Sequence, residues 1–450
     1  MKGIFHYLTP ASRAISCLLM MAVICVPQLL QAQTLTIADG LGVIASRGYD
    51  MRIARARQSS AEWAGTGAAA RLKPQVSAYA DQTWLENRPE AVFGGGTSPL
   101  SEDQTLRYGV TVRQLITDFG KTRAGVEAAR AGSRVQAIQT VMTRNEGALD
   151  FILSYVSLLQ AQRNLSLADQ VVQRYESHLA DARALHQAGE VTLNDVLTTQ
   201  VALANAQLGL IDAQDALVLS ASRVNFLVLR PFDEPVAGIE FPSPLAGLPE
   251  REEIIASAEA NRVELKILGE EIAAAEARLR HSEAEGYPSL FAGGGYSYEE
   301  NPYRVHEDNW SATIGLTWDL YTGGARKASE GQASGELSAL IARREKVSRI
   351  VGLEALDSHR LLTGATQRKE VAGKAVEQAQ ENLRLQHARY TEGEVSATEV
   401  TDAITALAQA ELNQWSALYG MRRAEARLLY AMGTDLVELY SGSGVLSENP

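Results

Sequence analysis

Two regions of the chain alternate between apolar and polar residues, which is the period of a β-strand with two different faces. In the first region the alternation starts at Gln75, is interrupted by turn residues, and resumes near Leu106. In the second it is clearest between Asn309 and Asp319, where the apolar positions are Trp310, Ala312, Ile314, Leu316 and Trp318. The pattern predicts two β-hairpins, over 75–116 and 289–320.

Each predicted hairpin is followed by a long run of helix-forming residues. Segments 122–188 and 326–392 each span 67 residues without proline. At ~1.5 Å per residue each would extend about 100 Å. Apolar residues such as Leu149, Leu153 and Val156 recur at spacings of three and four, as in a coiled coil. Shorter runs at 192–228 and 396–432 predict return helices.

The same order of elements occurs twice. Gly189-Glu190-Val191 and Gly393-Glu394-Val395 are 204 positions apart and lie between the long helix and the return helix of each half. A further helix is expected before each hairpin, over 36–71 and 249–285. We therefore expect two structural repeats, 33–228 and 250–432, joined by an irregular connector at 229–249 and followed by a tail, 433–450, that is disordered at its end.

Residues 1–32 have the pattern of a secretory signal peptide. Lys2 and Arg13 precede an apolar run from Ile15 to Pro27. Both cysteines, Cys17 and Cys25, lie inside it, so the exported chain has neither a disulfide nor a thiolate metal site. No later run reaches about 18 consecutive apolar residues, which predicts no membrane-spanning helix but leaves membrane β-strands possible.

Charge and motifs argue against several classes of protein. The net charge is −12, and about −14 without the signal peptide, which disfavours nucleic acid as a partner. There is no nucleotide-binding glycine loop and no zinc-type histidine pair, and Gly293-Gly294-Gly295 lies inside a predicted strand. We expect neither an enzyme nor a cofactor or metal site.

Aromatic residues stand near the ends of the apolar strand faces. A soluble β-sandwich would also show alternation, so alternation alone leaves both interpretations open. Trp310 and Trp318 are separated by about the length of a membrane-crossing strand, ~9 to 11 residues. Together with the signal peptide, this spacing favours an outer membrane, with an aromatic girdle formed by Trp84, Tyr108, Trp310 and Trp318.

Four strands cannot close a membrane barrel, because the smallest such barrels have about eight. The barrel is therefore expected to be shared between chains. Three copies would give twelve strands in the simplest closed arrangement, although strand counting also permits four copies.

The chain has the order hairpin, long helix, turn and return helix twice, and three local motifs lie within it. Together they resemble the TolC family of trimeric outer-membrane channel-tunnels. Segments 114–121 (QLITDFGK) and 320–326 (LYTGGAR) resemble its strand-to-helix signatures, and Tyr390 with Gly393, Val400 and Asp402 resembles its periplasmic tip. The resemblance covers essentially the whole exported chain.

The resemblance implies a mainly α fold with a membrane β part. Four strands per chain would enter a shared twelve-stranded trimeric barrel that continues as a coiled-coil tunnel through the periplasm. Such a tunnel is a passive exit duct for an inner-membrane ABC or proton-driven pump and a periplasmic adaptor, exporting proteins by type I secretion or small toxic molecules by efflux. A polar strand face with Arg107, Arg113, Thr313 and Asp319 suits a water-filled pore.

A periplasmic coiled-coil adaptor is the alternative, since adaptors also use long helical hairpins. Adaptors need no membrane strands, so detergent-dependent trimers in the outer membrane would decide between the two.

The resemblance also places three carboxylates at the periplasmic aperture. Asp402 and Glu399 match the family's acidic rings, and Asp195 comes from the first repeat. The pairs Ser396–Glu399 and Thr192–Asp195 equally fit a helix capping box, which would explain Glu399 and Asp195 without a gate. Val395 stands where the best-known member of the family has an arginine that helps to hold the aperture closed. The resemblance therefore does not identify the contacts that close this aperture.

The two turns are candidates for docking the adaptor. The residues concerned are Gly189, Glu190 and Val191 in the first turn and Gly393, Glu394 and Val395 in the second. A glycine is needed for the geometry of such a turn whatever binds there. The Glu-Val pairs are expected to be exposed.

Overall fold

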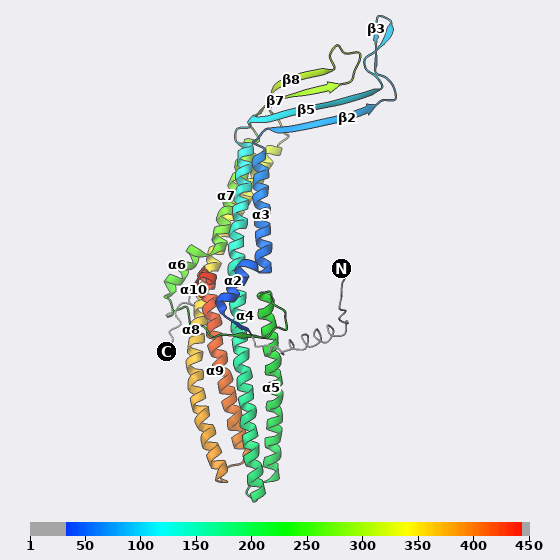
Figure 1. The fold of residues 1–450 in the computed structure, drawn as a ribbon. Coiled ribbons are helices and arrows are strands. Elements are labelled where there is room, and N and C mark those ends of the chain that lie inside the picture. The colour runs from blue at the N-terminus through cyan, green and yellow to red at the C-terminus, as the bar shows by residue number, and fades with distance from the viewer. Residues whose placement is uncertain (1–32, 246, 443–450) are drawn as a thin grey trace, which may run out of the picture.

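The fold was analysed in a computed structural model that describes residues 33–245 and 247–442. The expected signal peptide and the last residues of the tail lie outside the described residues. Figure 1 shows an elongated molecule with a β-sheet at one end and a layer of long helices at the other.

The sheet contains the strands expected from both alternating regions. Its order is β2 (Gln75–Trp84), β5 (Gln104–Thr117), β7 (Ser289–Glu299) and β8 (Asp308–Thr317), with every neighbouring pair antiparallel. β5 and β7 form the central pair and join the two hairpins. β2 and β8 are edge strands with one side unpaired.

The register of the strands gives the sheet one apolar and one polar face. Val76 pairs with Val112, which pairs with Gly294, which pairs with Ala312. The next layer on this face is Ala78, Val110, Tyr296 and Trp310. Polar residues share the other face, including Ser77 paired with Thr111, whose hydroxyl groups are 2.8 Å apart.

The segment expected as an irregular loop between β2 and β5 is partly ordered, which corrects the prediction. It forms a small hairpin of β3 (Glu90–Phe93) and β4 (Gly96–Pro99). Gly94 and Gly95 make its turn, with φ of +57° and +94°. Turn residues predicted a loop, but the short strands flanking them carry no clear alternation to reveal a hairpin.

Four helices form the opposite half of the molecule. They are α4 (Lys121–Ala188), α5 (Leu193–Leu227), α8 (Ala325–Thr391) and α9 (Ala397–Ala431). Figure 1 shows them side by side in the order α8, α9, α4, α5, so that α4 and α9 are central and α5 and α8 lie at the edges. The two long helices have 68 and 67 residues, close to the expected length.

The helix expected before each hairpin is broken in two. The first consists of α2 (Ile37–Arg47) and α3 (Tyr49–Ala70), and the second of α6 (Arg251–Asn261) and α7 (Val263–Ala284). Gly48 and Arg262 have ψ angles of 149° and 127°, which end the helical hydrogen bonding. The buried Arg262 side chain bonds Glu264 and Glu354, so a tertiary contact that the sequence pattern does not show fixes the second break.

The expected irregular connector and the start of the expected tail both contribute to the core in the middle of the molecule. In the connector, β6 (Val236–Gly238) pairs in parallel with β1 (Gln33–Leu35). The predicted tail begins with a helix, α10 (Leu436–Gly442), whose Leu436 and Tyr440 side chains are buried. Tyr155 of α4 donates a hydrogen bond to the carbonyl oxygen of Leu35 at 2.7 Å, which ties β1 to the long helix.

Candidate functional site at the helical tips and the sheet

The two turns at the free end of the helices have nearly the same backbone geometry. Gly189 and Gly393 have φ of +80° and +75°, in the left-handed region that glycine adopts without strain. In each turn the residue after the glycine donates a backbone hydrogen bond to a carbonyl five residues earlier: Glu190 to Leu185 and Glu394 to Arg389, both at 2.9 Å. Turn geometry alone therefore requires both glycines.

In each turn the glutamate of the Glu-Val pair is exposed and the valine is not, which corrects the expectation that both are exposed. Glu190 and Glu394 are exposed, and Glu394 pairs with Arg389 at 3.2 Å. Val191 and Val395 are half-buried because they pack against the apolar cluster at the tips. The surface open to a partner at these turns therefore consists mainly of the glutamates and the glycine backbone.

The capping-box interpretation holds for one acidic residue and fails for the other. The Asp195 carboxylate accepts hydrogen bonds from the Thr192 backbone amide at 3.0 Å and from the Thr192 hydroxyl at 2.7 Å. Partial burial opposes the charge, but these bonds and the Ala397 amide outweigh it, so the pKa of Asp195 is lowered. Ser396 makes no side-chain cap bond, so Glu399 has no capping partner.

Asp402 and Glu399 are exposed on the first turns of α9. Within the described part of the chain neither carboxylate has a hydrogen-bond or ion-pair partner, and no contact joins them to Asp195. Of the three predicted carboxylates, Asp402 and Glu399 are therefore unpaired in the described chain, and Asp195 caps the start of a helix.

A buried polar cluster, which the sequence did not reveal, joins the two helical hairpins behind these acids. His178 of α4 is 1% exposed, and its Nε2 lies 3.2 Å from the carbonyl oxygen of Ala397, the first residue of α9. The imidazole packs edge-on against Tyr390, with ring centroids 5.1 Å apart. Burial lowers the pKa of His178 and raises that of Tyr390. The His178 Nδ1 atom has no partner in the described chain.

Further polar contacts fasten α4 to α9 along their length. Arg174 binds Glu411 through two hydrogen bonds of 2.7 and 2.9 Å, and both side chains are largely shielded from solvent. The Tyr175 and Thr405 hydroxyl groups are 2.9 Å apart. These pairs are 237 and 230 residues apart in sequence, so no local motif could have indicated them.

Three of the four girdle residues stand near the outer end of the apolar sheet face, away from the helices. Tyr108 stacks on Tyr298, and Tyr296 contacts Trp310, with centroid distances of 4.8 and 5.2 Å. Trp84 ends β2 further out and is 69% exposed. Trp318 lies just beyond β8 at the helical end and donates a hydrogen bond to the Gly286 carbonyl. Tyr296 and Tyr298 extend the predicted set, and both could have been found from their alternation in β7.

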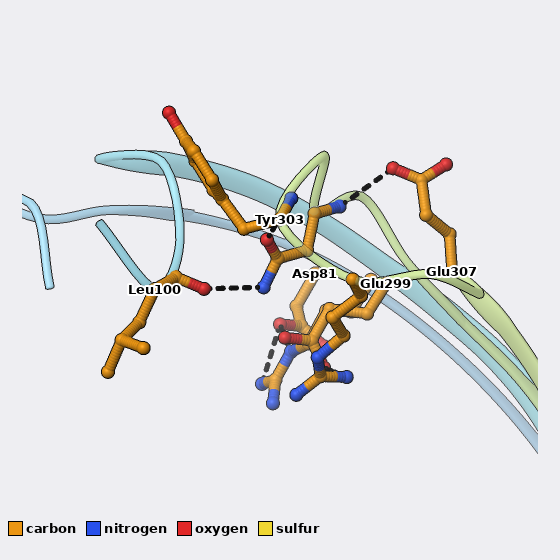
Figure 2. A network of polar contacts seen from close by, with 8 residues as sticks. Asp81, Leu100, Glu299, Tyr303 and Glu307 are labelled. Carbon is orange, nitrogen blue, oxygen red and sulfur yellow. Dashed lines mark hydrogen bonds and ion pairs between the residues drawn. The ribbon is translucent and has the colours of Figure 1, made fainter. Parts of the chain in front are cut away.

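The outer ends of the two hairpins are joined by the polar network in Figure 2. The Asn301 side chain is almost fully buried and donates to the Leu100 carbonyl at 3.0 Å, while its own backbone amide donates to Glu307 at 2.9 Å. Tyr303 donates a hydrogen bond from its hydroxyl to Glu102 at 2.8 Å. The loops beyond the strands are therefore held to each other.

Two kinds of feature are absent from the described residues. Residues 33–245 and 247–442 contain no group of three or more His, Cys, Asp or Glu side chains suited to a metal. None of the helices in this range has both the length and the apolar character needed to cross a membrane.

The fold, a long helical layer that ends in a small two-faced sheet, is similar to the folds of several solved outer-membrane proteins. CusC matches with a TM-score of 0.77 and 16% identity, over 88% of this chain and 92% of that one. The outer-membrane channel OprN matches with a TM-score of 0.77 and 17% sequence identity, over 89% of this chain and 90% of that one. The outer membrane protein VceC of Vibrio cholerae matches with a TM-score of 0.75 and 17% sequence identity, over 89% of this chain and 96% of that one. No curated protein sequence matches the chain.

The chain belongs to the outer membrane efflux protein family, whose model matches residues 42–228 and 254–434. It is therefore an outer-membrane efflux protein, in agreement with the family resemblance seen in its sequence. Family membership places the chain among outer membrane efflux proteins, and not among enzymes or periplasmic adaptors.

Proposed function

We propose that three copies of this chain assemble into a closed duct that crosses the outer membrane and extends into the periplasm. The observation that carries the proposal is the pair of open edges in the sheet. β2 and β8 are ten-residue strands that each leave the backbone groups of one edge unpaired, while one sheet face is apolar. Unpaired backbone groups are costly in lipid, so β8 of one copy would pair with β2 of the next.

The helical layer supports the same closure, because it also ends in two open edges. Exposed apolar residues of α5 follow a heptad spacing, at Leu197, Val201, Leu208, Ile211 and Val218. Such a stripe is a coiled-coil seam that has no partner among residues 33–245 and 247–442. We infer that it packs against the α8 edge of a neighbouring copy.

Three copies are favoured over two by the width of the lumen. Two copies would give eight strands, and an eight-stranded barrel is narrow enough for side chains to fill its interior. Three copies give twelve strands and leave an open interior lined by the polar sheet face. The girdle residues Trp84, Tyr108, Trp310 and Trp318 would then lie at the two membrane–water interfaces.

We infer that the duct is passive and serves an inner-membrane pump through a periplasmic adaptor. We infer efflux of small toxic molecules rather than type I secretion of proteins, and the word efflux in the family's description supports this choice. A strain lacking the gene should accumulate such compounds and regain resistance when the gene is restored. Unchanged resistance together with loss of a secreted protein would instead assign the duct to type I secretion.

The acidic groups at the tips are proposed as the aperture. Asp402 and Glu399 are exposed and unpaired on α9, so three copies would bring six carboxylates around the opening. Asp195 is inferred to act mainly through its cap, which sets where α5 begins. A ring of carboxylates attracts cations and needs other contacts to stay closed.

The turns are proposed as the docking surface for the adaptor, through Gly189, Glu190, Gly393 and Glu394, with Val191 and Val395 fixing the turns from inside. Changing both Glu190→Lys and Glu394→Lys should impair export while trimer and membrane insertion stay intact. The matched control, Glu190→Gln with Glu394→Gln, should show a weaker defect. Full export by the doubly reversed variant would remove these glutamates from docking.

A further inference from the structure

Arg113 stands on the polar face of the sheet, close to the end that meets the helices. It pairs in register with Gln75 on β2 and with Gly293 on β7. β5 ends four residues later at Thr117, and α4 begins at Lys121. The layer beyond it, toward the outer end, is uncharged and consists of Ser77, Thr111, Gly295 and Ser311.

β5 has two arginines on this face, and only one of them has its charge neutralised by an ion pair. Arg107, at the outer end, binds the Asp81 carboxylate through two hydrogen bonds of 2.9 and 2.8 Å. Arg113 is exposed and has no ion pair with any carboxylate in the described chain. Its charge is therefore available to groups that enter the space in front of the sheet.

An aromatic platform holds the Arg113 guanidinium. Its central carbon lies 4.2 Å from the centroid of the Phe291 ring, a cation–π geometry. The ring lies directly over Gly315, where an added Cβ would come within 2.2 Å of it. The stack of Gly315, Phe291 and Arg113 restrains the cation on the polar face, with its N–H groups free to donate.

We propose that Arg113 is a specificity residue of the duct. Resting on the proposed trimer, three Arg113 side chains form a cationic ring where the barrel meets the helical tunnel, and this ring contacts anionic groups such as carboxylates or sulfonates on passing molecules. Its sign is opposite to that of the carboxylates on the α9 tips. The carboxylate of Asp319 lies beyond the end of β8, six positions from Thr313 in the Arg113 layer. The layer of Arg113 itself is thus an anion-favouring zone, distant from the acidic entrance.

Ion selectivity in planar bilayers tests the ring. The reversal potential in a KCl gradient would be measured for the full-length protein and for Arg113→Gln. At ~0.01 M salt the screening length is about 30 Å, and the K⁺/Cl⁻ permeability ratio of the variant should be at least about twofold higher than that of the wild type. At ~1 M salt, with a screening length of about 3 Å, the difference should vanish.

Two matched variants separate charge from structure. The double variant Asp81→Asn with Arg107→Gln removes an ion pair of zero net charge, so its selectivity should equal that of the wild type. Phe291→Leu keeps the charge and removes the platform, so its shift should be smaller than that of Arg113→Gln. Outer-membrane yield and trimer content of each variant confirm assembly.

The outcomes distinguish this inference from the proposed channel. If the wild-type protein inserts but forms no conducting channel, the proposed function fails. If it conducts and Arg113→Gln leaves the reversal potential unchanged at low salt, the cationic ring is overturned while the channel stands. An equal shift from the double variant would also overturn it, because selectivity would then not depend on the unpaired charge.

Discussion

Asp402 carries the clearest residue-level consequence of the proposed aperture. It is exposed and has no hydrogen-bond or ion-pair partner among the described residues, so no described side chain neutralises its charge directly. Asp402→Ala should raise single-channel conductance and weaken Mg²⁺ block at least about tenfold, or ~1.4 kcal/mol, because three carboxylates leave the ring. Bilayer recordings measure both quantities.

Asp402→Asn is the matched control for shape, since it removes the charge and keeps the side-chain volume. It should reproduce the weaker block. If neither conductance nor block changes in either variant, the acidic gate lies elsewhere in the tunnel.

His178 predicts a pH dependence of the contact between the two helical hairpins. Its pKa in the folded protein lies below the ordinary value of 6.5 because burial disfavours the charged ring. The hydrogen bond to the Ala397 carbonyl and the charges of Asp181 and Asp195 oppose this shift, whereas His387 adds to it. The folded state therefore binds fewer protons than the unfolded chain. Stability is complete above about pH 6.5 and is lost as the pH falls through the lowered pKa.

The melting midpoint of the detergent-solubilised protein between pH 7.5 and 5 checks this sign. His178→Phe should lower the midpoint at pH 7.5 and flatten its decline toward pH 5. His186→Gln, at an exposed position nearby, should retain the decline. The same slope in wild type and His178→Phe would show that other groups control it.

Sequence reasoning at the residue scale succeeded where the interaction is local. Thr192 and Asp195 are three positions apart, so their capping box could be read directly. Ser396 and Glu399 have the same spacing but do not form one, because spacing permits a cap without fixing the side-chain rotamers. His178 and Arg174 were missed because their partners lie on α9, more than 200 residues away.

At the scale of elements, the two return helices provide an internal comparison. The Thr192 hydroxyl accepts a hydrogen bond from the Asp195 amide, whereas Ser396 makes no cap bond with its side chain. Thr192→Ala should cost about 1 kcal/mol and speed hydrogen exchange in the first turn of α5 roughly fivefold. Ser396→Ala should change α9 by no more than a few tenths of a kcal/mol. Equal effects in the two helices would contradict this difference.

Periodicity located the long elements better than the short ones. α4 and α8 begin within one residue of their expected starts, because the strand period of two changes there to a helical pattern. The helix breaks at Gly48 and Arg262 were not predicted. A single glycine is tolerated in helices, and the backbone break at Arg262 depends on the contacts of its side chain with Glu264 and Glu354. β3, β4, β6 and α10 are too short to show a period of their own.

At the scale of the whole molecule, one chain is incomplete in the same way in both of its parts. The sheet ends in the edge strands β2 and β8, each with one side unpaired, and the helical layer ends in α5 and α8. Each part therefore exposes two edges, and β8 can pair antiparallel with β2 of the next copy. The alternating sequence could predict that the barrel is shared, but the order of strands and helices that places these edges required the structure.

The mass of the assembly tests the central claim most directly. Native mass spectrometry of the full protein extracted from outer membranes in mild detergent should give three chains per complex, with no stable monomer. Leu208→Glu, which places a charge in the α5 seam, should reduce the share of trimer. A complex of one, two or four chains would contradict the twelve-stranded duct.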